Sequence, residues 1–227
     1  MNHVIILAGG IGQRMKMSVP KQYIDVNGMP VFMYSYLKFA NNPAISSIVI
    51  VLDDTWRPFV DEKIKQSGKN TKTAFAKSGN SRQHSVFNGM KVLAEYANED
   101  DIVLIHDSVR PLFPESIIES GIEACKIADG AIPVIPIKDA TYRSKNGNFM
   151  SEIIPREELY SGQSPEFFSF KRFFEAHKLF NDMEMQSIRG CSELAFRAGM
   201  SVKLINGAEQ NFKITTKEDL EAFKIYL

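Results

Sequence analysis

The sequence predicts an α/β fold built on a doubly wound, mainly parallel β-sheet, with one β-hairpin inserted late in the chain. Short apolar runs rich in β-branched residues alternate with longer segments whose apolar positions recur every three or four residues. This alternation is typical of strands buried between two layers of helices. A glycine-rich loop directly follows the first apolar run. At 227 residues the chain suits a single domain that spans residues 1–227.

The expected elements follow that alternation from one end of the chain to the other. Expected strands cover residues 4–7, 45–52, 72–77, 101–106, 130–137 and 201–205. Expected helices cover residues 29–40, 56–67, 82–96, 115–129, 171–180 and 190–198, and a last helix follows Thr216, its expected N-cap. Pro133 and Pro136 are expected to limit the pairing of their strand. Residues 138–159 contain Asn146-Gly147, which suits a tight hairpin turn, so a protruding arm for dimerisation is expected there.

Composition excludes several classes of function. Lys plus Arg and Asp plus Glu both total 27, so the net charge is zero and no global basic field favours nucleic acid or an anionic membrane. The two cysteines show no metal-site spacing and indicate reduced thiols. No apolar run approaches the ~20 residues that a membrane helix needs. We therefore expect a soluble, cytoplasmic protein.

The loop after the first strand is the first candidate site. It contains Ala8, Gly9, Gly10 and Gly12. Glycines let backbone N–H groups approach a ligand at the sheet edge, and the cations Arg14 and Lys21 follow shortly after. This combination favours a nucleoside triphosphate. A dinucleotide-binding dehydrogenase is the main competitor, but Met15 stands where its fingerprint needs a third glycine.

Two later loops also follow expected strands. The segment SGNSRQHSV contains Gly79, Asn80 and Ser85, which could contact a base or ribose or could simply form a turn and cap a helix. The segment HDSVRP contains Asp107, whose carboxylate suits Mg²⁺ shared with substrate phosphates, or a structural ion pair with Arg110. Because the carboxyl ends of parallel strands meet at one edge of a sheet, these loops are expected to lie together.

Six motifs in order resemble one family. ILAGGIGQRM with PKQY, SGNSRQHSV, IHDSVRP, PREELYSGQSP and NFKITTKEDL are similar to the CTP-dependent cytidylyltransferases of polyol phosphates, over residues 3 to 224. That group includes enzymes for 2-C-methyl-D-erythritol 4-phosphate and for ribitol 5-phosphate. The resemblance implies a Rossmann-like nucleotide-diphospho-sugar transferase fold and a homodimer joined by the hairpin arm. It also implies attack by a substrate phosphate oxygen on the α-phosphorus of CTP, with release of pyrophosphate.

The resemblance assigns expected roles residue by residue. Catalysis would fall to Arg14, Lys21 and Lys213. CTP would be bound by Leu7, Ala8, Gly9, Gly10, Gly12, Arg14, Lys21, Gly79, Asn80, Ser85 and Asp107, and Asp107 would hold Mg²⁺. The acceptor phosphate would be bound by Arg110, Thr141, Arg156, Ser164, Arg189 and Lys213. Thr141 and Arg156 belong to the arm and would act in the partner's active site.

Some positions depart from the methylerythritol branch of this family. Arg189-Gly190-Cys191 stands where that branch usually has Thr-Asp-Asp, and Gln210 replaces an aspartate before the Lys-Ile-Thr motif. The opening ILAGGIGxRM, YxGQ and Cys191 look more like the ribitol-phosphate branch, which we therefore favour over the methylerythritol branch. The altered positions also motivate an alternative reading as a nucleotide-binding homologue without transferase activity, and a uridylyl or guanylyl transferase is a closer rival.

Overall fold

A central β-sheet organises the computed structural model, which describes residues 1–10 and 19–227. Within the described residues the sheet has eight strands: β1 (Asn2–Leu7), β4 (Ser47–Leu52), β5 (Lys72–Lys77), β6 (Ile102–Asp107), β7 (Gly130–Pro136), β10 (Tyr160–Gly162), β11 (Glu166–Ser169) and β12 (Val202–Asn206). Their order is β10-β7-β11-β6-β1-β4-β5, and β12 pairs with β7. The pairs of β1 with β4 and β6, of β4 with β5 and of β7 with β12 are parallel, whereas β10 and β11 pair antiparallel with their neighbours.

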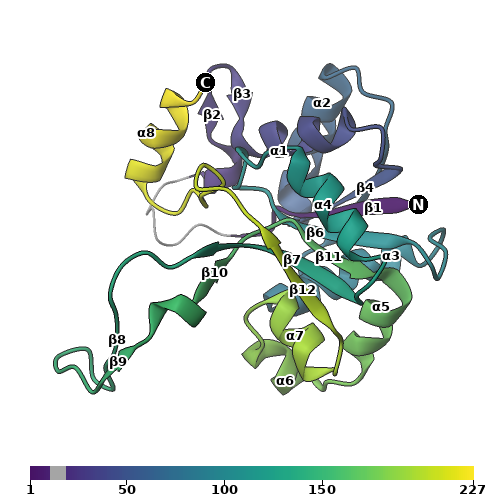
Figure 1. The fold of residues 1–227 in the computed structure, drawn as a ribbon. Coiled ribbons are helices and arrows are strands. Elements are labelled where there is room, and N and C mark those ends of the chain that lie inside the picture. The colour runs from purple at the N-terminus through teal and green to yellow at the C-terminus, as the bar shows by residue number, and fades with distance from the viewer. Residues whose placement is uncertain (11–18) are drawn as a thin grey trace.

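Helices cover both faces of this sheet, as Figure 1 shows. One apolar core lies against α1 (Val31–Ala40), α2 (Arg57–Gln66) and α4 (Ser116–Ala124). A second core lies against α3 (Arg82–Leu93), α5 (Phe170–Lys178), α6 (Asp182–Ser187) and α7 (Cys191–Arg197). Successive residues of β1 point to opposite faces, so Val4 and Ile6 belong to the first core and Ile5 to the second. The predicted doubly wound, mainly parallel fold is confirmed.

The last helix, α8 (Lys217–Ile225), packs on a small third core and begins as expected. The hydroxyl of Thr216 accepts from the backbone N–H of Asp219, whose carboxylate accepts from the N–H of Thr216 in return. This reciprocal cap stabilises the first turn. None of the helices in the described part of the chain is long and apolar enough to cross a membrane.

The segment 138–159 contains a separate two-stranded sheet, β8 (Thr141–Arg143) paired antiparallel with β9 (Glu152–Ile154). Gly147 in its turn has φ of +77°, a conformation that glycine adopts without a steric penalty. Figure 1 shows this hairpin extending away from the central sheet. Phe149, Met150 and Ile153 are exposed on it, so the hairpin presents apolar surface to its surroundings.

The sequence-based expectations need correction at three places. Pro133 and Pro136 were expected to limit the pairing of their strand, but β7 pairs with three other strands. A proline lacks the N–H donor but keeps its acceptor, and the carbonyl of Pro133 accepts from the N–H of Gln163 at 2.7 Å. The strands β10 and β11 and the helix α6 were not predicted. Residues 29–30 form the strand β3 (Met29–Pro30) paired with β2 (Asp25–Val26), so the helix expected at 29–40 begins at Val31.

Candidate active site

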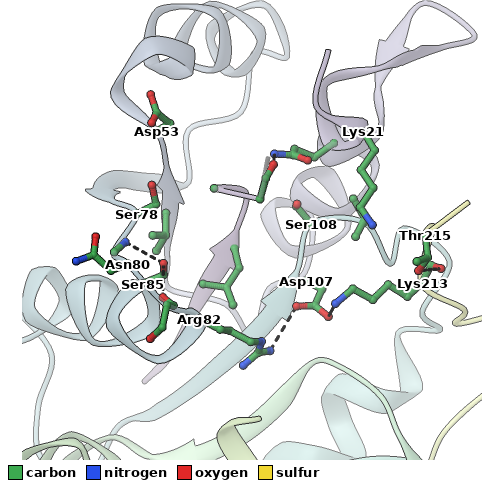
Figure 2. Close-up of a pocket in the computed structure, with 18 residues that line it drawn as sticks. Lys21, Asp53, Ser78, Asn80, Arg82, Ser85, Asp107, Ser108, Lys213 and Thr215 are labelled. Atoms are coloured by element: carbon green, nitrogen blue, oxygen red, sulfur yellow. Dashed lines mark hydrogen bonds and ion pairs between the residues drawn. The ribbon is translucent and has the colours of Figure 1, made fainter. Parts of the chain in front are cut away.

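A cavity of about 620 Å³ opens at the carboxyl ends of β1, β4, β5 and β6. Figure 2 shows its walls: Lys21 and Lys213 lie on one side, and the loop that carries Ser78 and Asn80 lies on the other. The described lining residues are Leu7, Gly9, Gly10, Lys21, Gln22, Val51, Asp53, Ser78, Gly79, Asn80, Ser81, Arg82, Ser85, Asp107, Ser108, Val109, Lys213 and Thr215. The loops predicted to lie together at this sheet edge do so.

The start of the opening loop is held from behind by the short 3-10 helix Lys21–Tyr23. The amide of Gln22 donates to the carbonyl oxygens of Ala8 and Gly10, at 2.7 Å each, and the hydroxyl of Tyr23 donates to Ala8 at 2.8 Å. Both side chains are buried. These bonds tie the backbone of the loop to the segment that carries Lys21, so the position of its amine is linked to the position of the loop.

Gly9 is needed for close approach between two walls of the cavity. A Cβ atom on Gly9 would lie 2.6 Å from the Cβ of Ser78, closer than real Cβ atoms come. A Cβ atom on neighbouring Gly10 would meet nothing within 4 Å. The two glycines therefore differ: the first permits packing and the second leaves space within the cavity.

The loop after β5 is organised by serines. Ser81 caps α3 by accepting from the N–H of His84, and Ser85 accepts from the N–H of Gly79 at 2.9 Å while it donates to the carbonyl of Ser81. These are the bonds of a capped helix start. Gly79, Asn80 and Ser85 still line the cavity, so the loop both caps a helix and presents polar groups to the space above the sheet.

Asp107 at the end of β6 is surrounded by cations. Its carboxylate accepts from Lys213 Nζ at 2.8 Å, lies 3.4 Å from Arg82 Nη2 and lies 3.8 Å from Arg110 Nε. Burial alone would raise the pKa of Asp107, but the charges of Arg82, Lys213 and Arg110 outweigh burial and hold that pKa well below its usual range. Asp107 is therefore ionised at all ordinary pH values.

Ser164 lies directly behind Asp107. Its hydroxyl oxygen accepts from the N–H of Asp107 at 3.1 Å and lies 3.3 Å from Nδ1 of His106. His106 is fully buried, and burial lowers its pKa to about 3, so the ring is neutral. A neutral ring can either accept a hydrogen bond from the Ser164 hydroxyl or donate one to it, depending on its tautomer, without bringing charge into the core.

A second cavity, of about 210 Å³, adjoins the first. Its described lining residues are Arg82, Asp107, Arg110, Ile132, Gly162, Gln163, Ser164, Glu166, Arg189, Gly190, Ser192 and Lys213. Arg82, Asp107 and Lys213 line both cavities. Four cations and two carboxylates stand around the second cavity, so its surroundings carry a net charge of +2. A dianion such as a phosphate monoester matches that charge.

The structure brings most of the predicted site residues to these two cavities. Of the expected CTP-binding residues, the first cavity is lined by Leu7, Gly9, Gly10, Lys21, Gly79, Asn80, Ser85 and Asp107. Of the expected acceptor-binding residues, the second cavity is lined by Arg110, Ser164, Arg189 and Lys213. Ala8 is buried just behind the first cavity. Gly12 and Arg14 lie outside the described residues.

Thr141 and Arg156 line neither cavity of the described chain. Thr141 belongs to β8 on the hairpin, and the guanidinium of Arg156, just after β9, donates to the carbonyl of Lys138. Their expected contact with an acceptor could therefore be made only in another subunit or after the hairpin moves.

Sequence reasoning missed two charged residues at this site. Arg82 and Glu166 meet at 3.3 Å, and both line the second cavity. Arg82 stands inside the SGNSRQHSV motif at the first position of α3, where a solvated surface cation was as plausible as a buried one. Glu166 follows Ser164-Pro165, and no periodic pattern marked its strand.

The donor set around Asp107 fits a magnesium ion only in part. Among the described residues no group of three or more His, Cys, Asp or Glu side chains could hold a metal ion. Mg²⁺ commonly binds through one or two carboxylates and takes its other ligands from phosphates and water. Asp107 fits that second arrangement, in which the ion is shared with a bound triphosphate.

A doubly wound sheet with a large cavity at the carboxyl ends of its strands, next to a smaller cation-lined cavity, has the architecture of an α/β protein that binds a ligand at that edge. The family model described as IspD, 2-C-methyl-D-erythritol 4-phosphate cytidylyltransferase, matches residues 2–227. The chain belongs to this family, and it is a nucleotidyltransferase of the cytidylyltransferase type.

Relatives of the chain carry two names. A 2-C-methyl-D-erythritol 4-phosphate cytidylyltransferase of Clostridium kluyveri is 34% identical over 221 residues, covering 96% of this chain and 93% of the relative. A ribitol-5-phosphate cytidylyltransferase of Lacticaseibacillus paracasei is 30% identical over 229 residues, covering 98% and 96%. A solved 2-C-methyl-D-erythritol 4-phosphate cytidylyltransferase of Francisella tularensis superposes with a TM-score of 0.83 at 23% identity, over 100% of this chain and 99% of that one. The last comparison supports the fold.

Proposed function

We propose that the chain transfers CMP from CTP to a polyol phosphate, with ribitol 5-phosphate as the acceptor. A phosphate oxygen of the acceptor attacks the α-phosphorus of CTP. The bond from that phosphorus to the oxygen bridging to the β-phosphate breaks, and pyrophosphate leaves with the bonding electrons. The observation that carries the proposal is the meeting of the two cavities at Arg82, Asp107 and Lys213. An attacking anion in the second cavity would thus lie next to a triphosphate in the first.

In this proposal the chain acts by positioning and by stabilising charge. Lys21 and Arg14 bind the triphosphate, and the amine of Lys213 stabilises the negative charge that builds up at the five-coordinate phosphorus. The backbone of residues 7–10 and the loop with Gly79, Asn80 and Ser85 bind the cytidine. Ser164, Arg110 and Arg189 bind the acceptor.

We include Mg²⁺ as a cation that arrives with CTP. When bound, the ion would neutralise phosphate charge. Among the described residues, Asp53 and Asp107 are the two carboxylates that line the first cavity. Asp53 lies across the cavity on the β4 side and caps a 3-10 turn through Thr55, so Asp107 would hold the ion. Three neighbouring cations oppose binding of a free divalent ion to Asp107.

The lining of the second cavity favours ribitol 5-phosphate over methylerythritol 4-phosphate. Among the described residues that line it, Ile132 is the single aliphatic side chain, and the others are polar, charged or glycine. An unbranched polyol presents hydroxyls along its whole length, whereas a methyl branch gains from apolar contact. Methylerythritol 4-phosphate remains the second candidate, because the family model and the relatives at 34% identity carry its name.

We further propose a cytoplasmic homodimer in which the hairpin arm enters the partner's active site. Exposed apolar side chains on β9 and its turn support an interface, since such residues are usually covered. In that dimer Thr141 and Arg156 of one subunit would contact the acceptor phosphate bound by the other.

An acceptor screen tests the proposal. The purified protein is incubated with CTP and Mg²⁺ and with ribitol 5-phosphate, methylerythritol 4-phosphate or a related pentitol or sugar phosphate, and pyrophosphate release is measured. We expect the highest kcat/KM with ribitol 5-phosphate, and parallel assays with UTP and GTP should give little turnover. A higher kcat/KM with methylerythritol 4-phosphate would overturn the choice of acceptor. Binding of CTP by calorimetry without turnover on any acceptor would indicate a nucleotide-binding homologue instead.

A further inference from the structure

Arg82 stands in the wall that the two cavities share, and its guanidinium meets three different groups. Nη2 lies 3.4 Å from a carboxylate oxygen of Asp107 and 3.3 Å from one of Glu166, while Nη1 lies 2.8 Å from the sulfur of Cys191. Only a quarter of the side chain is exposed. Figure 2 shows it reaching from the start of α3 toward Asp107. One nitrogen is thus shared almost equally between two carboxylates.

Glu166 is itself held firmly. It lies on β11 opposite Ile105 of β6, two residues before Asp107, so the sheet fixes the spacing between the two carboxylates. Its other carboxylate oxygen accepts from the N–H of Ser192 in the first turn of α7, at 2.8 Å. The side chain is 7% exposed. Glu166 therefore has little freedom to follow Arg82 if the guanidinium moves.

Cys191 contributes no charge to this cluster. Burial raises the pKa of its thiol far above the ordinary value, and Arg82 lowers it only in part. The sulfur accepts a weak bond from Arg82 as a neutral group. The single charge of Arg82 is therefore divided between Asp107 and Glu166 alone.

We propose that Glu166 and Arg82 form a positioning pair that keeps Asp107 available to the reaction. Glu166 draws the guanidinium to one side, so that Arg82 touches Asp107 through one nitrogen and does not close on it as a two-pronged pair. Without Glu166, the fork of Arg82 would turn to Asp107 and compete with Lys213 and with the cation carried by CTP. Neither residue is needed to touch a substrate for this effect.

This inference rests on the proposed reaction, but it concerns how the charge of Arg82 is shared between Asp107 and Glu166. Arg82 lines both cavities and Glu166 lines only the second. A purely acceptor-binding role for Glu166 would change the KM for the acceptor phosphate. A positioning role predicts a different result, in which kcat falls and CTP with Mg²⁺ binds more weakly, while CTP without a divalent ion binds as before.

A double-mutant cycle tests the pair on the acceptor that the wild-type protein uses best. Glu166→Gln keeps the shape and the acceptor for Ser192 but removes the charge, and Arg82→Met removes the fork. We expect Glu166→Gln to lower kcat by about tenfold, as is usual for residues that orient a metal-binding carboxylate, and to weaken binding of Mg·CTP severalfold by calorimetry. In the Arg82→Met background the same change should alter kcat by less than a factor of two, because Glu166 acts through Arg82. Glu175→Gln, which breaks an exposed pair with Lys178 on α5, is the matched control and should behave like the wild type.

Thermal melting shows whether each variant is folded. The calorimetric measurements of CTP binding, with and without Mg²⁺, do not depend on turnover. Equal fractional losses from Glu166→Gln in the wild-type and Arg82→Met backgrounds would overturn the inference, as would a change confined to the KM of the acceptor. Wild-type turnover on an unexpected acceptor would revise the proposed function and leave this test intact. If Arg82→Met does not fold, the cycle is built on Arg82→Lys, which keeps the charge and lacks the two-pronged geometry.

Discussion

Lys213 donates to Asp107 at 2.8 Å, although 106 residues separate the two along the chain. Asp107 ends β6, and Lys213 stands in the segment between β12 and α8, so the pair joins the centre of the sheet to the C-terminal part of the chain. The amine lies at the boundary of the two cavities. A cation at that boundary is available both to an attacking phosphate and to a triphosphate.

Replacing Lys213 by methionine should abolish most of the activity. The change keeps most of the aliphatic side chain and removes the charged amine, which should lower kcat by about 10²–10³, the usual cost of one group that stabilises a developing charge. Arg82 and Arg110 would still lie beside the buried carboxylate of Asp107, so the melting temperature should change little. Steady-state pyrophosphate release measures the effect, and Lys203→Met on β12 is the control for loss of an exposed lysine. Unchanged kcat in the Lys213 variant would remove this amine from the reaction.

Gly9→Ala should destabilise the protein, whereas Gly10→Ala should not. The added methyl group at Gly9 would lie 2.6 Å from the Cβ of Ser78, and overpacking of that kind costs about 1–3 kcal/mol. At Gly10 an added methyl group meets nothing within 4 Å. Urea titrations give the free energy of unfolding for both variants.

The cause of the Gly9 effect can be tested by a second substitution. Ser78→Gly removes the atom that the new methyl group would strike, so the double variant Gly9→Ala, Ser78→Gly should recover most of the lost stability. Failure of Ser78→Gly to rescue Gly9→Ala would place the strain elsewhere in the loop.

Two buried histidines should make the protein less stable as the pH falls below about 6.5. Burial lowers the pKa of His106 to about 3 and that of His177 to about 4, and both titrate near 6.5 when unfolded. Between these values the unfolded chain binds more protons than the folded one. The free energy of unfolding should therefore drop by up to about 1.4 kcal/mol per pH unit for each histidine, and about twice that for both.

The effect of the histidines on stability can be separated from the effect of the carboxylates, because the two act in different pH ranges. Asp101, whose pKa is lowered to about 2 by bonds that outweigh its burial, loses its contribution only below about pH 4. Replacing His177 by phenylalanine keeps the stacking on Phe87 and removes one titrating group. Urea titrations between about pH 7 and pH 4.5 should then show about half the wild-type slope. An unchanged slope would mean that His177 is protonated in the folded state.

The sequence was sufficient where a pattern is local. The strand at 72–77 was predicted with its observed bounds, because an extended run is closed there by Ser78-Gly79. The meeting of Lys21, Asp107 and Lys213 could also be expected, because parallel strands deliver their carboxyl ends to one edge. Local pattern, topology and family resemblance agreed for these residues.

The partners of Arg82 could not be predicted in the same way. Glu166 lies on an antiparallel strand of four residues, too short for a clear period, which returns beside β6 only in the folded sheet. Whether an arginine at the start of a helix is solvated or buried depends on what packs above it. In this protein the side chain of Arg82 contacts Glu166 of β11 and Cys191 of α7, which lie 84 and 109 residues further along the chain.

The hairpin arm predicts that two inactive variants can restore activity to each other. Lys21→Ala removes a cation from a subunit's own cavity, and Arg156→Ala removes a cation that we place in the partner's site. Each variant alone should lose activity by orders of magnitude, because every site lacks one cation. In a mixed dimer, the site built from the intact Lys21 of one subunit and the intact Arg156 of the other has both.

The two variants are mixed in equal amounts under conditions that let subunits exchange. Half of the dimers are then mixed, and each mixed dimer has one complete site of two. The mixture should therefore recover about a quarter of the wild-type activity. Wild-type protein carried through the same exchange gives the reference value, and sedimentation checks that the variants form dimers. The variant Ile153→Asp, which puts a charge on the exposed apolar face of β9, should prevent the recovery by weakening the interface. Recovery would be zero if Arg156 served its own subunit, because each subunit of the mixture would then carry its own defect.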